Sequence, residues 1–204
     1  MKTKKIILTI ALALFTSVGA LAQDGIGLGL KAGVAGNWIP GTYVDVGDDV
    51  LPNFGFYGGL YGFAEFSDTM FGQVELLYSR KGIYYTKSPL LGKYTRNLSY
   101  IQLPLLVGFK LHDDAVNIAF GPAFAYCVGN TVKAQTLNPS SASDVAPFNL
   151  SAIVQARYAI TESFGVDLRF DVGLTRTFKS ESASHPDKGH NSSVQLGVSY
   201  MFGQ

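Results

Sequence analysis

The sequence contains little cysteine, histidine or charge. Cys127 is the only cysteine among 204 residues, so no internal disulfide can form, and its small neighbours favour a packing role. Charged residues make up 15% of the chain, and the formal net charge is only +1. Such a balance gives no electrostatic reason to expect nucleic acid as a partner. The composition therefore suggests neither a disulfide scaffold nor a nucleic-acid-binding protein.

Long hydrophobic runs are also missing, except at the N-terminus. Lysines among the first five residues precede an apolar run over 6–18, and Ala20-Leu21-Ala22 supplies the small-x-small pattern of a cleavage site. The run is shorter than the roughly 20 residues that a membrane-spanning helix needs. We therefore expect a signal peptide over 1–22 and one mature domain over 23–204. Removal of three lysines leaves 13 Lys and Arg against 15 Asp and Glu, a net charge of −2.

A helical period of 3.6 is absent from almost all of the mature chain, and a period of two recurs instead. The clearest case is the segment 164–178, where Asp167, Arg169 and Asp171 alternate with large apolar residues. Such alternation is typical of strands with one apolar and one polar face. The predicted strands lie near 26–35, 54–66, 70–82, 98–111, 116–128, 148–160, 164–178 and 193–202.

The connections between these strands alternate in length. Tight turns are expected at 67–69, 112–115 and 161–163, and long polar loops at 37–53, 83–97, 129–147 and 179–192. Strands of about ten residues, joined by short turns on one side and long loops on the other, are typical of transmembrane barrels. A soluble β-sandwich would alternate too, but its strands are usually shorter. We predict an all-β, eight-stranded antiparallel up-and-down transmembrane β-barrel in the outer membrane, with periplasmic termini and extracellular long loops.

Aromatic residues gather near both ends of the predicted strands, as expected for girdles at the two membrane interfaces. The group near the short turns comprises Phe66, Phe71, Phe109, Phe164 and Phe202. The group near the long loops comprises Trp38, Tyr84, Tyr85, Tyr100, Tyr126, Phe148 and Phe178.

Several stretches resemble the PorT-like outer-membrane β-barrel family of Gram-negative bacteria. The most specific are the run from Glu75 to Gly82, Glu-Leu-Leu-Tyr-Ser-Arg-Lys-Gly, and Ile101-Gln102-Leu103-Pro104-Leu105-Leu106. The resemblance covers essentially residues 25–203. It implies an OmpX/OmpA-like barrel and, because the family includes a secretion-system component, envelope or secretion proteins as partners.

The last predicted strand resembles the signal that the barrel-assembly machinery recognises. Gln195, Gly197, Tyr200 and Phe202 occupy its polar, glycine and two aromatic positions, although Gly203-Gln204 extend beyond the usual terminal aromatic. The resemblance implies that the barrel-assembly machinery is a partner during insertion.

Two prolines fall inside predicted strands. Pro104 and Pro122 cannot donate to a β-ladder, so we expect bulges or strained ends there.

Eight charged residues are predicted to point into the lumen, which eight strands leave just wide enough for side chains. Because unpaired buried charges are very costly, we expect a salt-bridge network that plugs the barrel. A proton or ion path is the alternative, whereas an open pore does not fit this strand number. The predicted network consists of Lys31, Glu65, Glu75, Lys110, Arg157, Asp167, Arg169 and Asp171.

Catalysis has little support in the sequence. His185, Asp187, His190 and Glu181 share one serine-rich loop, but no pattern fixes a nucleophile beside a base, and the same residues make a weak metal site. We predict neither an enzyme nor a bound cofactor or metal. The expected partners are outer-membrane lipid and lipopolysaccharide. The apolar loop 37–53 suggests a partner, a lipopolysaccharide contact or a fold back over the barrel mouth.

Overall fold

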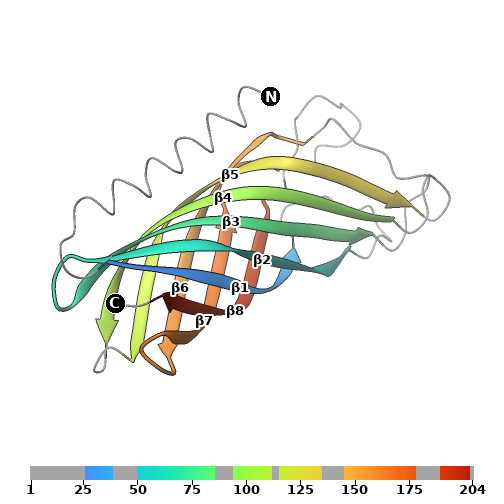
Figure 1. The fold of residues 1–204 in the computed structure, drawn as a ribbon. Helices are drawn as coiled ribbons and strands as arrows, with labels where there is room; N and C mark the ends of the chain where they lie inside the picture. The colour runs from blue at the N-terminus through green and yellow to red at the C-terminus, as the bar shows by residue number, and fades with distance from the viewer. Residues whose placement is uncertain are drawn as a thin grey trace.

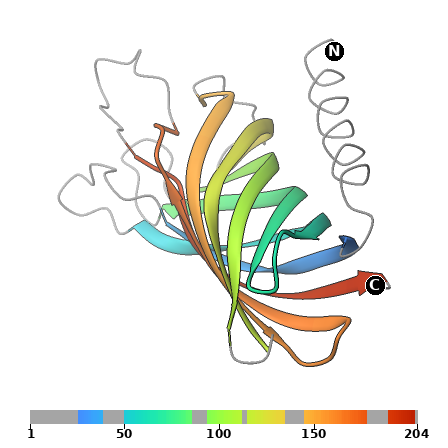
Figure 2. The ribbon, with the colours of Figure 1, turned by 90° about the vertical axis from the view of Figure 1, so that its left-hand side faces the viewer.

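The computed structural model describes residues 26–38, 50–85, 94–111, 115–134, 145–177 and 189–202. In these ranges the chain forms eight antiparallel strands in sequence order, and pairing of β8 with β1 closes the sheet into a barrel (Figures 1 and 2). The strands are β1 (Ile26–Trp38), β2 (Val50–Glu65), β3 (Met70–Tyr85), β4 (Tyr94–Leu111), β5 (Val116–Ala134), β6 (Phe148–Ala159), β7 (Phe164–Gly173) and β8 (Ser192–Phe202). The predicted eight-stranded antiparallel barrel is confirmed.

Alternation of side chains sets the two faces of the wall. Along β7, Asp167, Arg169 and Asp171 are buried in the lumen, whereas Leu168 and Phe170 are exposed on the outer surface. The period of two in the sequence therefore converts directly into an inner polar face and an outer apolar face.

Hydroxyl side chains stabilise the two short turns that the structure describes. Between β2 and β3, the Ser67 Oγ accepts hydrogen bonds from the backbone N–H groups of Thr69 and Met70. Between β6 and β7, the Thr161 Oγ1 accepts one from the Phe164 N–H at 3.0 Å. Both turns lie at the end of the barrel where β8 ends, which we call the short-turn mouth (Figure 1). Most of the turn predicted at 112–115 lies outside the described residues.

Several predicted boundaries were wrong at the other end of the barrel. The β4–β5 ladder continues to Tyr94↔Ala134 and that of β2–β3 to Val50↔Tyr85, so the loops predicted at 37–53, 83–97 and 129–147 are shorter. Backbone pairing extends these strands where side-chain alternation fades.

The segment 164–178, by contrast, was predicted too long. The ladder of β7 ends at Gly173, because the N–H groups of Leu174 and Thr175 both donate to the Leu150 carbonyl. The Thr175 Oγ1 also accepts from the Leu150 N–H at 2.8 Å, which replaces a regular ladder bond.

The predicted bulges at Pro104 and Pro122 were also wrong. The register on either side of Pro104 is constant, and β5 pairs with β6 in one register through Pro122↔Ala152. The ladder is only interrupted: pairing between β4 and β5 stops at Pro104↔Ala123 and resumes at Val107↔Phe120. The register shifts of the described strands lie elsewhere, between Pro52 and Phe56 and between Ser99 and Tyr100.

Two aromatics assigned to the girdles lie inside the barrel instead. Phe71 and Tyr100 are each 1% exposed, and the Phe71 ring packs 4.7 Å from that of Phe63. Their position along the strand suits an interface, but their parity directs them inward. Trp38, Phe66 and Phe202 are exposed on the outer surface. The side chains of Tyr84, Tyr85 and Phe178 lie outside the described residues.

Candidate functional site

The centre of the lumen holds four buried charges of balanced sign. Lys31 of β1, Glu75 of β3, and Asp167 and Arg169 of β7 form this central tetrad. The Lys31 Nζ lies 2.9 Å from the Glu75 Oε1 and 3.4 Å from the Asp167 Oδ1. The Arg169 Nη2 donates to the other oxygen of Glu75 at 2.7 Å. Glu75 is therefore held between two cations on different strands.

Amide side chains complete the hydrogen bonding of the tetrad. Gln155 accepts a hydrogen bond from the Lys31 Nζ at 2.9 Å, and the amide of Gln73 donates to Glu75. Neither carboxylate oxygen of Asp167 receives a hydrogen bond from another described residue, so Lys31 balances its charge at a longer distance. The arrangement fits a desolvated set of charges, which is stable only while each charge keeps its partner.

Two tyrosine rings occupy the lumen beside the tetrad. The Lys31 Nζ lies 5.2 Å from the centre of the Tyr61 ring, and the Arg169 guanidinium lies 5.7 Å from that of Tyr57. Two glycines of the adjacent strand β1 leave room for both rings: a Cβ at Gly29 would lie 2.5 Å from the Tyr61 ring, and one at Gly33 2.6 Å from that of Tyr57. Cation–π contact and close packing thus fill the space around the charges.

A second buried ion pair lies toward the long-loop end. The Lys81 Nζ lies 2.6 Å from the Asp171 Oδ2, which also accepts a hydrogen bond from Gln102 at 3.2 Å. The sequence prediction omitted Lys81. Its parity along β3 is that of Glu75, and this signal was available in the sequence.

The remaining predicted charges lie at the short-turn mouth. The Lys110 Nζ is 2.7 Å from the Glu65 Oε1, and the Glu65 side chain keeps 30% of its surface exposed. The Arg157 Nε donates to the Ser199 Oγ at 3.0 Å. Although Arg157 and Asp167 pair across adjacent strands, the structure gives no ion pair between them. The eight predicted charges therefore form separate groups along the lumen.

Apolar side chains also lie inside the barrel near the short-turn mouth. A buried cluster of eight apolar residues surrounds the Phe63–Phe71 contact. Its members are Tyr61, Phe63, Phe71, Leu106, Ala119, Ala123, Ile153 and Met201. Charged groups and apolar groups are therefore both buried inside the described part of the barrel.

The four residues assigned to the assembly signal lie on β8. Gln195 and Gly197 face the lumen, and Tyr200 and Phe202 are about half exposed on the outer surface. The rings of Tyr200 and Phe202 meet edge to face, with centres 5.7 Å apart. These positions form the closing seam of the barrel beside β1.

Most of the residues weighed for catalysis or metal binding lie outside the described residues. They contain no group of three or more His, Cys, Asp or Glu side chains that could hold a metal ion. His190 forms an isolated bridge with Arg176, whereas Glu181, His185 and Asp187 lie outside the described residues. Cys127 is half-buried, and its Sγ donates to the Gly129 carbonyl at 3.4 Å. In the same ranges, no helix has the length and apolar character needed to cross a membrane.

Comparison with known proteins identifies the family of this barrel. Residues 21–179 match the family model described as outer membrane protein beta-barrel domain. No curated protein matches the chain.

Solved structures share the fold at low sequence identity. The chain is similar to Neisserial surface protein A, with 14% identity, a TM-score of 0.52, and coverage of 88% of this chain and 98% of the other. It is also similar to Ail, the attachment invasion locus protein of Yersinia pestis, solved with the heparin analogue sucrose octasulfate. There the identity is 14% and the TM-score 0.50, with 87% and 99% of the two chains covered. These likenesses establish the fold alone.

Proposed function

The chain belongs to the outer membrane protein β-barrel domain family, and from this premise we propose that it is a non-conducting barrel of the outer membrane with a structural, binding or envelope-assembly role. The barrel acts as a rigid support, and its long connections carry the recognition surface.

The central tetrad carries this proposal. Lys31, Glu75, Asp167 and Arg169 come from three strands, meet across the lumen and are fully buried. An eight-stranded wall leaves an interior that side chains fill, so a closed set of charges in its middle leaves no room for hydrated ions. The same charges balance in sign, which favours a permanent plug over a selective path.

Planar-bilayer recording tests the closed lumen. The purified barrel is expected to give no defined single-channel steps, because the tetrad and the apolar cluster fill its cross-section. A larger outer-membrane porin, inserted under the same conditions, serves as the positive control. Reproducible steps of one conductance, seen at several protein concentrations, would contradict the proposal.

The orientation follows from the alternation of short and long connections. In this class the short turns face the periplasm and the long loops face outside, which places both termini in the periplasm. Residues 1–22 then act as a cleaved signal peptide, and Gln195, Gly197, Tyr200 and Phe202 serve the assembly machinery. An epitope inserted in 179–188 should bind antibody on intact cells, and one inserted at 67–69 should not. The reverse pattern would overturn the orientation.

A secretion-associated role is the second candidate, supported by the resemblance of the Glu75–Gly82 run to PorT-like barrels. In this chain Glu75 and Lys81 of that run both hold lumen ion pairs, so the motif also has a structural explanation. A secretion role predicts a secretion defect on deletion and co-purification with envelope proteins. A lipid-modifying activity would instead alter lipid A or phospholipid in cells that express the protein, and His185→Ala or His190→Ala would abolish the change.

A further inference from the structure

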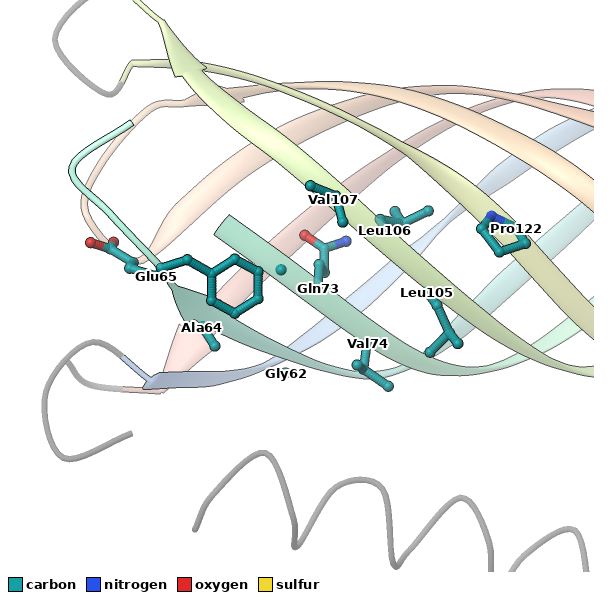
Figure 3. Close-up of a pocket in the computed structure, with 11 residues that line it drawn as sticks. Gly62, Ala64, Glu65, Gln73, Val74, Leu105, Leu106, Val107 and Pro122 are labelled. Carbon is teal, nitrogen blue, oxygen red and sulfur yellow. The ribbon is translucent and has the colours of Figure 1, made fainter. Parts of the chain in front are cut away.

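An apolar groove of about 520 Å³ crosses the outer wall near the short-turn mouth (Figure 3). It is lined by residues of β2 to β5, among them the small residues Gly62, Ala64 and Gly72. Larger neighbours such as Val74 and Val107 border it, and the Phe66 ring packs over Gly72, 2.5 Å from where a Cβ would lie. Because this face of an outer-membrane barrel meets lipid, the groove suits a hydrocarbon chain.

The groove lies over a gap in the β4–β5 ladder. Leu105 and Pro122 both line it, and pairing between β4 and β5 is interrupted at this pair. Leu106 also lines it and belongs to the apolar cluster of the lumen. The gap in the β4–β5 ladder and the small side chains of β2 and β3 together make the outer surface deeper here than it would be over a regular ladder.

A polar cavity of about 330 Å³ lies inside the wall at the same end. We call it the mouth cup. It is lined by two cations, Lys110 and Arg157, and two acids, Glu65 and Glu162. Asn117 lines it as well, and among the described residues neither its Oδ1 nor the Arg157 Nη2 has a hydrogen-bond partner, although both side chains are more than nine-tenths buried. The cup therefore retains capacity to bind a polar group.

One residue joins the two hollows. Glu65 lines both the apolar groove and the mouth cup, and its carboxylate lies at the groove's end away from Pro122 (Figure 3). An apolar channel that ends beside a cavity of mixed charge matches an amphiphile with one hydrocarbon chain and a head of both signs. Arg and Lys side chains bind phosphate, and carboxylates accept hydrogen bonds from an ammonium group.

We propose that the groove and the mouth cup form one site for a zwitterionic phospholipid, whose acyl chain lies in the groove and whose phosphoethanolamine head lies at the cup. The site deepens the binding role proposed above and names the class of ligand. With the short turns in the periplasm, this lipid belongs to the inner leaflet of the outer membrane.

Native mass spectrometry of the full chain tests the acyl part of this site. The folded barrel is released from nanodiscs that contain phosphatidylethanolamine, phosphatidylglycerol and lipid A, and the lipids it retains are measured. Ala64→Leu fills the groove, whereas Ala156→Leu adds the same group on the outer face of β6, away from the groove. The leucine of A64L should displace about two methylene groups of the acyl chain from the groove, which lowers phosphatidylethanolamine retention roughly tenfold. Retention by A156L should not change. A heat-dependent shift on a denaturing gel verifies that each variant is folded.

The head-group part has its own matched variants. Glu162→Gln removes an acid of the cup, and Asp68→Asn removes an exposed acid from the other described short turn. E162Q should reduce the preference for phosphatidylethanolamine over phosphatidylglycerol several-fold, and D68N should leave it unchanged. Equal retention of the two phospholipids by the natural chain, retention of lipid A in their place, or equal losses in A64L and A156L would overturn the proposal. Single-channel recording is independent of these results, so a conducting barrel that still retains the lipid would fail only the closed-lumen function.

Discussion

The Lys31–Glu75 pair in the middle of the lumen and the Lys110–Glu65 pair at the short-turn mouth share a chemistry and differ in their access to water. Their nitrogen–oxygen distances are similar, 2.9 and 2.7 Å. The side chains of the first pair are fully buried, whereas those of Lys110 and Glu65 keep 10% and 30% of their surface exposed. Distance alone therefore says little about what each pair contributes to the barrel.

Burial changes the consequence of losing a partner. A charge left alone in the middle of the lumen is shielded from bulk water, while a charge at the mouth lies closer to it. The central charges are thus a fully buried set, whereas the Lys110–Glu65 pair belongs to the partly exposed mouth and its cup.

The largest effect is expected for Glu75→Gln. This substitution keeps the shape of the side chain but leaves Lys31 and Arg169 without the anion that both contact. The free energy of unfolding should fall by about 3–5 kcal/mol. Urea titration of the barrel in lipid vesicles measures this, and a loss below about 1 kcal/mol would mean that water reaches the tetrad.

A charge on the opposite face of the wall should cost slightly less. Leu168 lies on the outer surface between Asp167 and Arg169, so Leu168→Arg places a cation in lipid. We expect a loss of about 2–4 kcal/mol near the bilayer midplane, measured by folding into vesicles. Asp167→Asn, its inward neighbour, should instead affect only the lumen partners. Equal small losses in both variants would contradict the facing of β7.

Replacing a whole buried pair should cost little. Lys81→Met alone leaves the Asp171 carboxylate buried without its cation and should destabilise the barrel. The double variant Lys81→Met/Asp171→Leu removes both charges and should recover stability to within about 1 kcal/mol of the natural chain. The two variants are compared by the same urea titration. A double variant as unstable as the single one would show that the pair is needed for more than mutual neutralisation.

The smallest effect is expected at the mouth. Glu65→Gln removes one ionic partner of Lys110 at a partly exposed site, so the loss should stay below about 1 kcal/mol. Salt should weaken the contribution further, which a titration at two ionic strengths detects. A loss as large as that of Glu75→Gln would place the mouth in the same desolvated region as the tetrad.

Much of the fold could be predicted, because an alternation of period two indicates both that a segment is a strand and which of its side chains point inward. Asp167, Arg169 and Asp171 alternate with apolar neighbours, and their inward direction follows from that pattern alone. Strand ends were harder. The extension of β5 to Ala134 depends on backbone pairing with β4, which needs no alternation of side chains.

The partners inside the lumen could not be predicted from the sequence. Lys31 and Glu75 are 44 residues apart, and Arg169 and Glu75 are 94 apart, so their contacts depend on the register of every strand between them. Tyr100 shows a second limit, because its place near a strand end suggests an interface while its parity places it in the lumen. The groove could not be predicted for a similar reason, since Ala64 and Gly72 meet only across the β2–β3 ladder.

Double-mutant cycles in lipid vesicles test the central claim most directly, because they isolate the coupling within each pair. One cycle combines Lys31→Met with Glu75→Gln, and the other combines Lys110→Met with Glu65→Gln. We expect a coupling free energy of about 2 kcal/mol or more for the central pair and below about 1 kcal/mol for the mouth pair. Two equally small couplings would contradict the account, because they would show that water reaches the middle of the lumen.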